Sequence, residues 1–258
     1  MYGKKIQSLT NLRIVLDLDS TLVHSSIDMA TFESLRIYSN PLNIPLRERV
    51  YSFDLVDANG DAGHGERTPM WGVFRPHLKK FIDFMAMYFK EIYIYSAGLY
   101  KYVNSVTDII FSGALVQPTL VYSRDDCVTH LNDLVKPLTK LYNDPRATGS
   151  NESNTLVLDD REKTFCFNTY NGIKIPIYEP NPSPMDILKD DICLEQLMYW
   201  LSLPEVMNCR DVRELDKSEI FTRPLIYYTR AIDPTFTASY DYNLNLNKTI
   251  DLVGIARM

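Results

Sequence analysis

Two aspartates stand at the end of an apolar run near the start of the chain, in "LRIVLDLDSTLVHSS" (residues 12–26). Asp17 and Asp19 are two residues apart, and Ser20 and Thr21 follow directly. Because a buried carboxylate is costly unless it is paired, hydrogen-bonded or metal-bound, either a capping role or a chemical role must account for the pair. A carboxylate in this place can attack phosphorus. A second acid two residues further on can protonate the departing oxygen and then activate water.

Polar side chains also follow two later apolar runs. Ser96 comes after "EIYIY", and Asp159 and Asp160 end the run "TLVLDD". Parallel strands bind ligands at their carboxyl ends, so four carboxylates would converge if these runs are neighbouring strands. Their mutual repulsion requires a cation, and an all-oxygen set of ligands suits Mg²⁺. A lysine and a hydroxyl could neutralise a bound phosphate.

The apolar pattern predicts the elements that would position these residues. Strands are expected at 13–17, 91–98, 119–123, 155–160 and 173–179, from short stretches rich in apolar residues. Helices are expected with Pro76 in the first turn, over 99–111 and over 186–203, with a helical or turning segment at 135–144. This alternation predicts an α/β fold, with a mostly parallel sheet and helices on both faces. Residues 50–74 predict a β-hairpin with "ANGDAGHG" as its turn.

Composition describes an ordinary globular chain of 258 residues that is 45% hydrophobic and 23% charged. The net charge of −6 gives no global reason to expect a nucleic-acid or acidic-membrane partner. The four cysteines form no C-x-x-C pair, which favours small buried hydrophobes in a reducing compartment. With neither an apolar signal region nor a run of about 18 apolar residues, we expect an intracellular protein of the nucleus or cytoplasm, without a membrane partner.

Taken in order, the motifs resemble the haloacid-dehalogenase superfamily, and within it the phosphatases of the RNA polymerase II C-terminal domain. The resemblance covers roughly residues 10–216. It is carried by "LDLDSTLVH", "RPH" at 75–77, "SAGLYKYVNSVTDII" at 96–110, "RDDCV" at 124–128, "VKPLTKL" at 135–141, "LDDRE" and "DVREL" at 211–215. A lone D-x-D would be weak evidence, but a set of motifs in this order is specific.

The resemblance implies roles for the reacting groups. Asp17 would be the nucleophile and Asp19 the general acid/base. Ser96 and Lys136 would bind the phosphoryl oxygens, with Ser96 standing where the family has threonine. Mg²⁺ would be held by Asp17, Asp160 and the backbone carbonyl of Asp19. We prefer Lys136 to the rival "NDL" at 132–134, which lacks a lysine, because the V-K-x-L-x-x-L frame fits it.

Four further residues have supporting roles by the same resemblance. Thr21 would hold the loop after the nucleophile, and Asp159 would orient the metal or its waters. Arg124 and Tyr102 are candidates for gripping a phosphopeptide, and a purely structural role is equally open for both. Ser20 stands where the family usually has glutamate, and the sequence offers no reason for that change.

The implied function is a Mg²⁺-dependent protein phosphatase acting on phosphoserine or phosphothreonine through a phosphoaspartyl intermediate. Residues 1–216 would form the haloacid-dehalogenase-like domain, with a small β insert at about 45–74, and 217–258 would be an extension of unknown role. A small insert leaves an open cleft that suits an extended protein tail, such as the RNA polymerase II C-terminal domain. The alternatives are a phosphatase for a small metabolite or a polynucleotide end, and a non-catalytic phosphopeptide- or protein-binding module.

Overall fold

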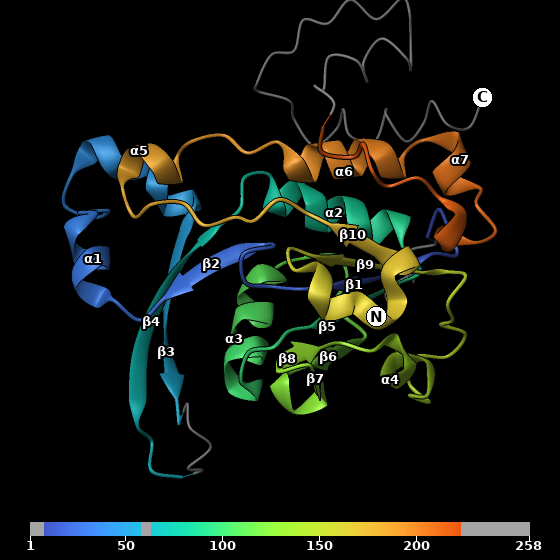
Figure 1. The fold of residues 1–258 in the computed structure, drawn as a ribbon. Coiled ribbons are helices and arrows are strands. Elements are labelled where there is room, and N and C mark those ends of the chain that lie inside the picture. The colour runs from blue at the N-terminus through green and yellow to red at the C-terminus, as the bar shows by residue number, and fades with distance from the viewer. Residues whose placement is uncertain (1–7, 58–62, 223–258) are drawn as a thin grey trace, which may run out of the picture.

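The computed structural model describes residues 8–57 and 63–222, and at its centre lies a parallel β-sheet of five strands (Figure 1). The strands run in the order β10-β9-β1-β5-β6. Their bounds are β1 Arg13–Leu16, β5 Glu91–Tyr95, β6 Leu120–Tyr122, β9 Thr155–Asp159 and β10 Gly172–Lys174. This arrangement confirms the predicted α/β fold with a parallel sheet.

The register of the three central strands brings their carboxyl ends to one level. Leu16 of β1 pairs with Ile94 of β5 on one side and with Leu158 of β9 on the other. All four residues of β1 are buried, as expected for the middle strand of a sheet that is covered on both faces. The polar residues that follow these positions therefore meet at one edge of the sheet.

Helices cover both faces of the sheet, as predicted. One face packs Ile14, Leu16, Ile92, Ile94, Leu156 and Leu158 against α2 (Leu78–Tyr88), α3 (Tyr100–Ile110) and α6 (Cys193–Leu201). The other face packs Val15, Tyr93, Tyr95 and Val157 against α4 (Leu138–Tyr142) and the 3-10 segment η3 (Glu162–Asn171). Neighbouring residues of each strand point to opposite faces, which is why odd and even positions divide between two cores.

The insert is larger than a hairpin. β3 (Val50–Val56) and β4 (Arg67–Phe74) form the predicted antiparallel pair, and β2 (Val23–Ser26) joins the other edge of β4. Helix α1 (Met29–Ser34) and the 3-10 segment η1 (Pro41–Glu48) lie between β2 and β3 in the chain, where the sequence pattern was irregular. The three-stranded sheet therefore begins at residue 23, outside the expected range of 45–74. In Figure 1, β3 and β4 extend away from the parallel sheet.

The single helix expected over 186–203 is wrong. The chain instead forms α5 (Pro184–Ile187) and α6, with residues 188–192 between them. Asp191 explains the break, because its carboxylate accepts a hydrogen bond from the backbone N–H of Cys193 at the start of α6. The same carboxylate binds Arg75. An apolar period does not reveal that a polar residue inside it binds the backbone N–H two residues further on.

Two other expected elements are shorter than predicted. The strand expected over 173–179 ends at Lys174, because Pro176 has no N–H to donate to a neighbouring strand. Helix α2 begins at Leu78 rather than at Pro76, since His77 at its N-cap adopts a left-handed backbone with φ of 64°. The hairpin of β7 (Val128–His130) and β8 (Asp133–Val135), which leads into Lys136, was not expected.

The C-terminal part of the described chain packs on the domain. Helix α7 (Pro204–Met207) and the 3-10 segment η4 (Val212–Glu214) follow α6, and Ile220 is buried in the same core as α2 and α6. The extension expected over 217–258 lies outside the described residues from 223 onward. Within the described ranges, no helix combines the length and apolarity needed to cross a bilayer.

Candidate active site

The loop after β1 is anchored by leucines, and its aspartates lie between them. Leu18 and Leu22 are fully buried, and the backbone N–H groups of Leu22 and Val23 donate to the Leu18 carbonyl. This tight turn alternates apolar anchors with acids. Asp17 continues the line of β1, and its N–H donates to the Leu158 carbonyl at 3.0 Å.

Asp17 shares a buried ion pair with Lys136. The Lys136 Nζ lies 2.5 Å from Asp17 Oδ1 and 2.7 Å from Asp159 Oδ2. All three side chains are almost wholly buried. Lys136 follows β8 and is held by its own N–H, which donates to the Thr164 carbonyl. The structure thus brings the predicted lysine to the predicted nucleophile.

Thr21 connects the loop after β1 to the end of β9. Its hydroxyl oxygen lies 3.1 Å from Asp17 Oδ2 and 3.4 Å from Asp160 Oδ1. The backbone N–H of Asp160 donates to the same hydroxyl at 3.1 Å. The expected role of Thr21 in holding this loop is consistent with these contacts. Asp159 Oδ1 in turn accepts from the Arg161 N–H at 2.8 Å, which fixes the orientation of its carboxylate.

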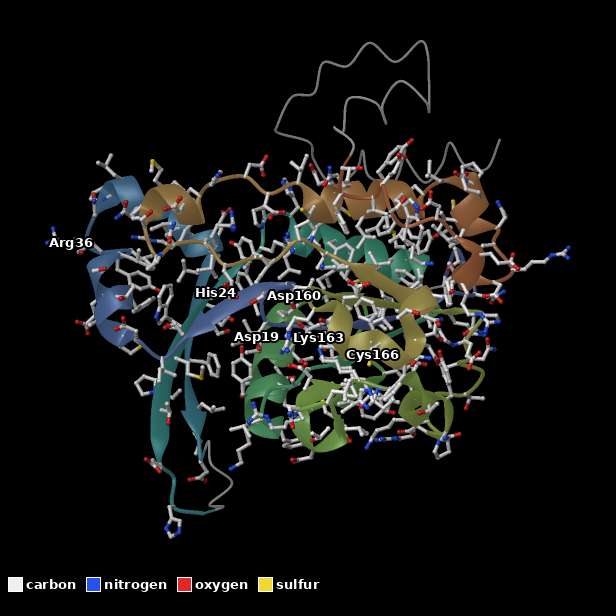
Figure 2. The ribbon with its side chains drawn as sticks, in the orientation of Figure 1. Asp19, His24, Arg36, Asp160, Lys163 and Cys166 are labelled. Carbon is white, nitrogen blue, oxygen red and sulfur yellow. The ribbon has the colours of Figure 1, made fainter. Side chains whose placement is uncertain are left out.

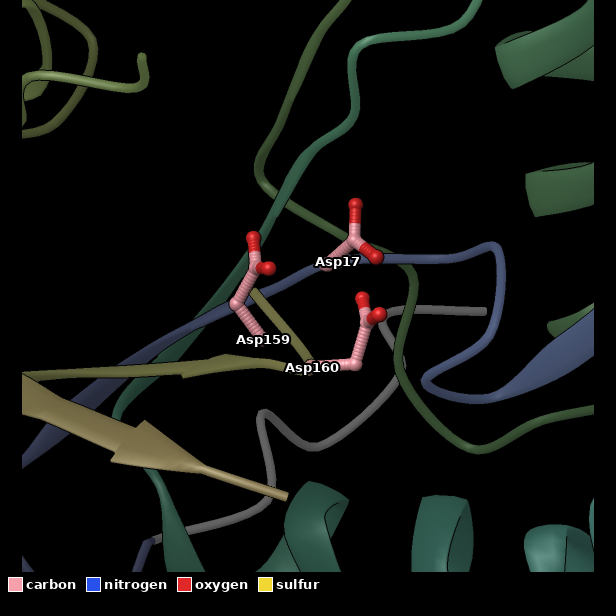
Figure 3. A group of neighbouring side chains, drawn as sticks. All are labelled: Asp17, Asp159 and Asp160. Carbon is pink, nitrogen blue, oxygen red and sulfur yellow. The ribbon is translucent and has the colours of Figure 1, made fainter. Parts of the chain in front are cut away.

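Three carboxylates meet at the ends of β1 and β9 (Figure 3). Asp17, Asp159 and Asp160 each offer one oxygen, and these oxygens lie within 4.8 Å of one another. Lys136 supplies one positive charge for the three acids. A hard divalent cation fits this donor set, because oxygen ligands and excess negative charge are what Mg²⁺ requires.

Burial sets the electrostatics of this cluster. It raises the pKa of Asp17, and the positive charge of Lys136 opposes that rise. Burial acts to lower the pKa of Lys136, but the charges of Asp17 and Asp159 outweigh it and raise the pKa, so the lysine stays protonated. Burial and the charge of Asp159 raise the pKa of Asp160. The electrostatics of the site therefore favour the binding of a cation by these carboxylates.

Asp19 lies apart from this cluster. Its carboxylate accepts a hydrogen bond from the Tyr102 hydroxyl of α3, and the same hydroxyl lies 2.7 Å from Ser25 Oγ. Asp19 and Asp160 come from the loops that leave β1 and β9 (Figure 2). Burial raises the pKa of Asp19, although the Tyr102 bond opposes the rise. A carboxyl with a raised pKa retains a proton closer to neutral pH, as a general acid must.

The remaining predicted residues lie around the end of β5. Ser96 is buried, and its hydroxyl accepts from the Gly98 N–H at 3.1 Å. Arg124 is exposed, and its Nε donates to the Ala97 carbonyl at 2.8 Å. Tyr102 is buried and directed at Asp19. The Tyr102 hydroxyl, a candidate for gripping a phosphopeptide, is thus already bound to the predicted general acid.

The Arg75 guanidinium connects three segments around the site, a role that the sequence did not predict. It is fully buried and donates to the Thr21 carbonyl at 3.0 Å, to the Pro176 carbonyl at 2.8 Å, and to both carboxylate oxygens of Asp191. The signal in the sequence that could have indicated this role is the position of an arginine between an apolar strand and a helix. Its partners lie 54, 101 and 116 residues away, so the sequence could not reveal them.

The structure also accounts for Ser20. This residue has a left-handed backbone with φ of 60°, and its hydroxyl donates to Glu179 at 2.9 Å. The Tyr178 N–H donates to the Ser20 carbonyl at 2.8 Å. A carboxylate is therefore present beside position 20, but it comes from the segment after β10.

Comparison with known proteins gives consistent results. The family model described as "NLI interacting factor-like phosphatase" matches residues 12–213. The chain is 29% identical to CTD small phosphatase-like protein 3 of Caenorhabditis elegans, across 82% of this chain and 60% of that protein. It is 26% identical to human carboxy-terminal domain RNA polymerase II polypeptide A small phosphatase 1, across 71% of this chain and 58% of that protein. The chain thus spans about three fifths of the length of these two relatives.

Among solved structures, the chain resembles the fission yeast RNA polymerase II CTD phosphatase Fcp1 bound to beryllium fluoride. The TM-score is 0.53 and the sequence identity 25%, across 96% of this chain and 63% of that one. The likeness agrees with the α/β fold predicted from the sequence.

Proposed function

The chain belongs to the NLI interacting factor-like phosphatase family, within the haloacid-dehalogenase superfamily, and from this premise we propose that it hydrolyses phosphoserine or phosphothreonine in proteins. One observation carries the proposal. The Asp17 carboxylate lies at the end of the central strand, 2.5 Å from a buried lysine and within 4.8 Å of two further acids. This arrangement provides a nucleophile, a counter-charge for phosphate and a set of ligands for a cation.

In the proposed reaction, an oxygen of Asp17 attacks phosphorus and forms an aspartyl phosphate as the bond to the serine oxygen breaks. Asp19 donates its proton to the departing serine oxygen. Water then attacks the phosphorus of the aspartyl phosphate while Asp19 takes one of its protons. Phosphate leaves, the Asp17 carboxylate is regenerated, and Asp19 is again protonated.

Lys136 has a clear part in this scheme. Its ammonium neutralises the charge of the phosphoryl oxygens, and because it already bonds Asp17 it also orients the attacking carboxylate. The Ser96 hydroxyl, at the end of the neighbouring strand, would donate to a phosphoryl oxygen. When bound by Asp17, Asp160 and the Asp19 carbonyl, Mg²⁺ would supply further positive charge for the phosphoryl group. Asp159 bonds Lys136 and would orient the metal or its waters.

An extended phosphopeptide is the proposed substrate class. Both relatives named above are described as phosphatases of the RNA polymerase II C-terminal domain or as similar to them. The tail of RNA polymerase II is therefore one candidate substrate, in the nucleus or the cytoplasm. Arg124 is exposed beside the end of β5, where it could contact a peptide that places its phosphate on Asp17.

The test is hydrolysis of p-nitrophenyl phosphate by the full chain with Mg²⁺. Asp17→Asn should abolish turnover, and EDTA should abolish it in the wild type. Asp108→Asn is the matched control, because Asp108 is exposed on α3 away from the carboxylate cluster. Full activity of Asp17→Asn would contradict the proposed mechanism.

A second assay separates the substrate classes. Turnover of a phosphoserine peptide should exceed that of a sugar phosphate at equal concentration. The reverse order would favour a metabolite phosphatase. Binding of the phosphopeptide without turnover, in the presence of Mg²⁺, would favour a non-catalytic binding module.

A further inference from the structure

A line of three hydroxyl groups leads from the insert to the predicted general acid. The Tyr102 hydroxyl bonds the Asp19 carboxylate. Ser25 Oγ lies 2.7 Å from the Tyr102 hydroxyl oxygen and 2.7 Å from the hydroxyl oxygen of Tyr51. The four groups come from the loop after β1, from α3, from β2 and from β3. The insert is therefore connected to Asp19 through side chains.

The number of hydrogens defines the direction of this line. Each hydroxyl carries one hydrogen, and an ionised carboxylate can only accept. With the Tyr102 hydrogen on Asp19, the single hydrogen of Ser25 is left for Asp19, which it also contacts, or for Tyr102, and Tyr51 then donates to Ser25. In either case Ser25 gives away its own hydrogen, and the Tyr51 hydroxyl is the donor that its oxygen accepts from.

A glycine in β4 makes this contact across the sheet possible. Gly72 pairs with Ser25 on one side and with Tyr51 on the other, so the three residues form one row across the sheet β2-β4-β3. A Cβ at Gly72 would lie 2.3 Å from the Tyr51 hydroxyl oxygen. The Tyr51 ring therefore passes over a position without a side chain to reach Ser25. Any larger residue would block this path.

The surroundings of Tyr51 would otherwise suit a phenylalanine. Its ring packs on Phe74, with the ring centroids 4.8 Å apart, and the residue is 8% exposed. A buried hydroxyl costs stability unless it is hydrogen-bonded, and the partner of this one is Ser25. The hydroxyl is thus tied to the line that ends on Asp19.

We propose that Tyr51 is a positioning residue, which acts through Ser25 and Tyr102 to hold the Asp19 carboxyl in place for proton transfer to the departing oxygen. The inference rests on the function proposed above. It assigns the insert a part in the chemical step, since β3 supplies the outermost hydroxyl of the line. Losing that hydroxyl would remove the donor to the Ser25 oxygen and loosen the hold of Ser25 on Tyr102 and Asp19.

The test compares two substrates that differ in their need for a general acid. A phosphoserine peptide releases an alkoxide that must be protonated, whereas p-nitrophenyl phosphate releases a stable phenolate. Tyr51→Phe should lower kcat/KM for the peptide about tenfold, which is part of the 10²–10⁴-fold that general acid–base catalysis contributes. It should lower kcat/KM for p-nitrophenyl phosphate less than about twofold. The KM for the peptide should stay close to the wild-type value.

The matched control is Tyr88→Phe, which removes a buried hydroxyl that donates to the Leu201 carbonyl on α6, away from Asp19. Its ratio of kcat/KM values between the two substrates should equal that of the wild type. Ser25→Ala should change this ratio at least as much as Tyr51→Phe, and the double variant should lose no more than Ser25→Ala alone, because Tyr51 acts through Ser25.

Equal losses on both substrates in Tyr51→Phe, or no loss on either, would overturn the inference while leaving the phosphatase activity itself established. Additive losses in the double variant would also overturn it. A wild type inactive on both substrates would refute the proposed function, and the inference would fall with it.

Discussion

Arg75→Met removes the guanidinium that connects the nucleophile loop to the rest of the fold and keeps a side chain of similar length. In the native structure this group bonds the Thr21 carbonyl, the Pro176 carbonyl and both oxygens of Asp191. Methionine can fill the space of the aliphatic stem but donates no hydrogen bond. The variant therefore isolates the polar role of the arginine.

The expected cost follows from what is left behind. Arg75 is 1% exposed, and its two bonds to Asp191 measure 3.1 and 2.9 Å, so a bidentate ion pair is lost at a largely buried place. Removing one partner of such a pair costs about 3–5 kcal/mol, because the remaining charge is uncompensated. Arg75→Met should therefore lower the free energy of unfolding by about 3–5 kcal/mol.

Urea denaturation with far-UV circular dichroism measures this loss as a shift in the midpoint at constant slope. Lys79→Met is the matched control, because its ammonium is exposed on α2 and, among the residues that the structure describes, forms its ion pair with Asp83 of the same helix, so the midpoint should not change. The variant Arg75→Met/Asp191→Leu should recover part of the loss, since the stranded carboxylate is gone. A loss below about 1 kcal/mol in Arg75→Met would refute the reasoning.

Three other expectations follow from the structure. Burial acts to raise the pKa of Asp191, but Arg75 outweighs it and the pKa is lowered. The stabilisation by the Asp191 carboxylate is therefore present above the unfolded pKa of about 3.9 and is lost as pH falls through the folded pKa. The unfolding free energies of the wild type and of Asp191→Asn should therefore converge in acid. Gly172→Ala should cost about 1–3 kcal/mol in thermal or urea unfolding, because a Cβ would press on the Phe165 ring; an unchanged midpoint would contradict this. Mg²⁺ should raise the melting temperature of the wild type. Asp160→Asn should remove that shift, whereas the control Asp108→Asn should keep it.

The predictions that succeeded depended on patterns local in sequence. Short apolar runs predicted the central strands, and the acids directly after them had to follow those strands to the edge of the sheet. The break between α5 and α6 was missed because the role of Asp191 depends on Arg75, which is 116 residues away. A helical period records which face is apolar, but it does not record which polar residue a distant side chain will bind.

By itself, the sequence determined the α/β alternation and the positions of Asp17, Asp159 and Asp160 at strand ends, because these follow from the side-chain period and from the chain direction of parallel strands. Only the tertiary structure decided which charges and hydroxyls meet there. Lys136 reaches Asp17 across 119 residues, and Tyr51 is linked to Asp19 through a row of side chains that passes over a glycine. Such contacts depend on distances of a few ångströms between distant segments, and those distances are set by packing of the whole domain.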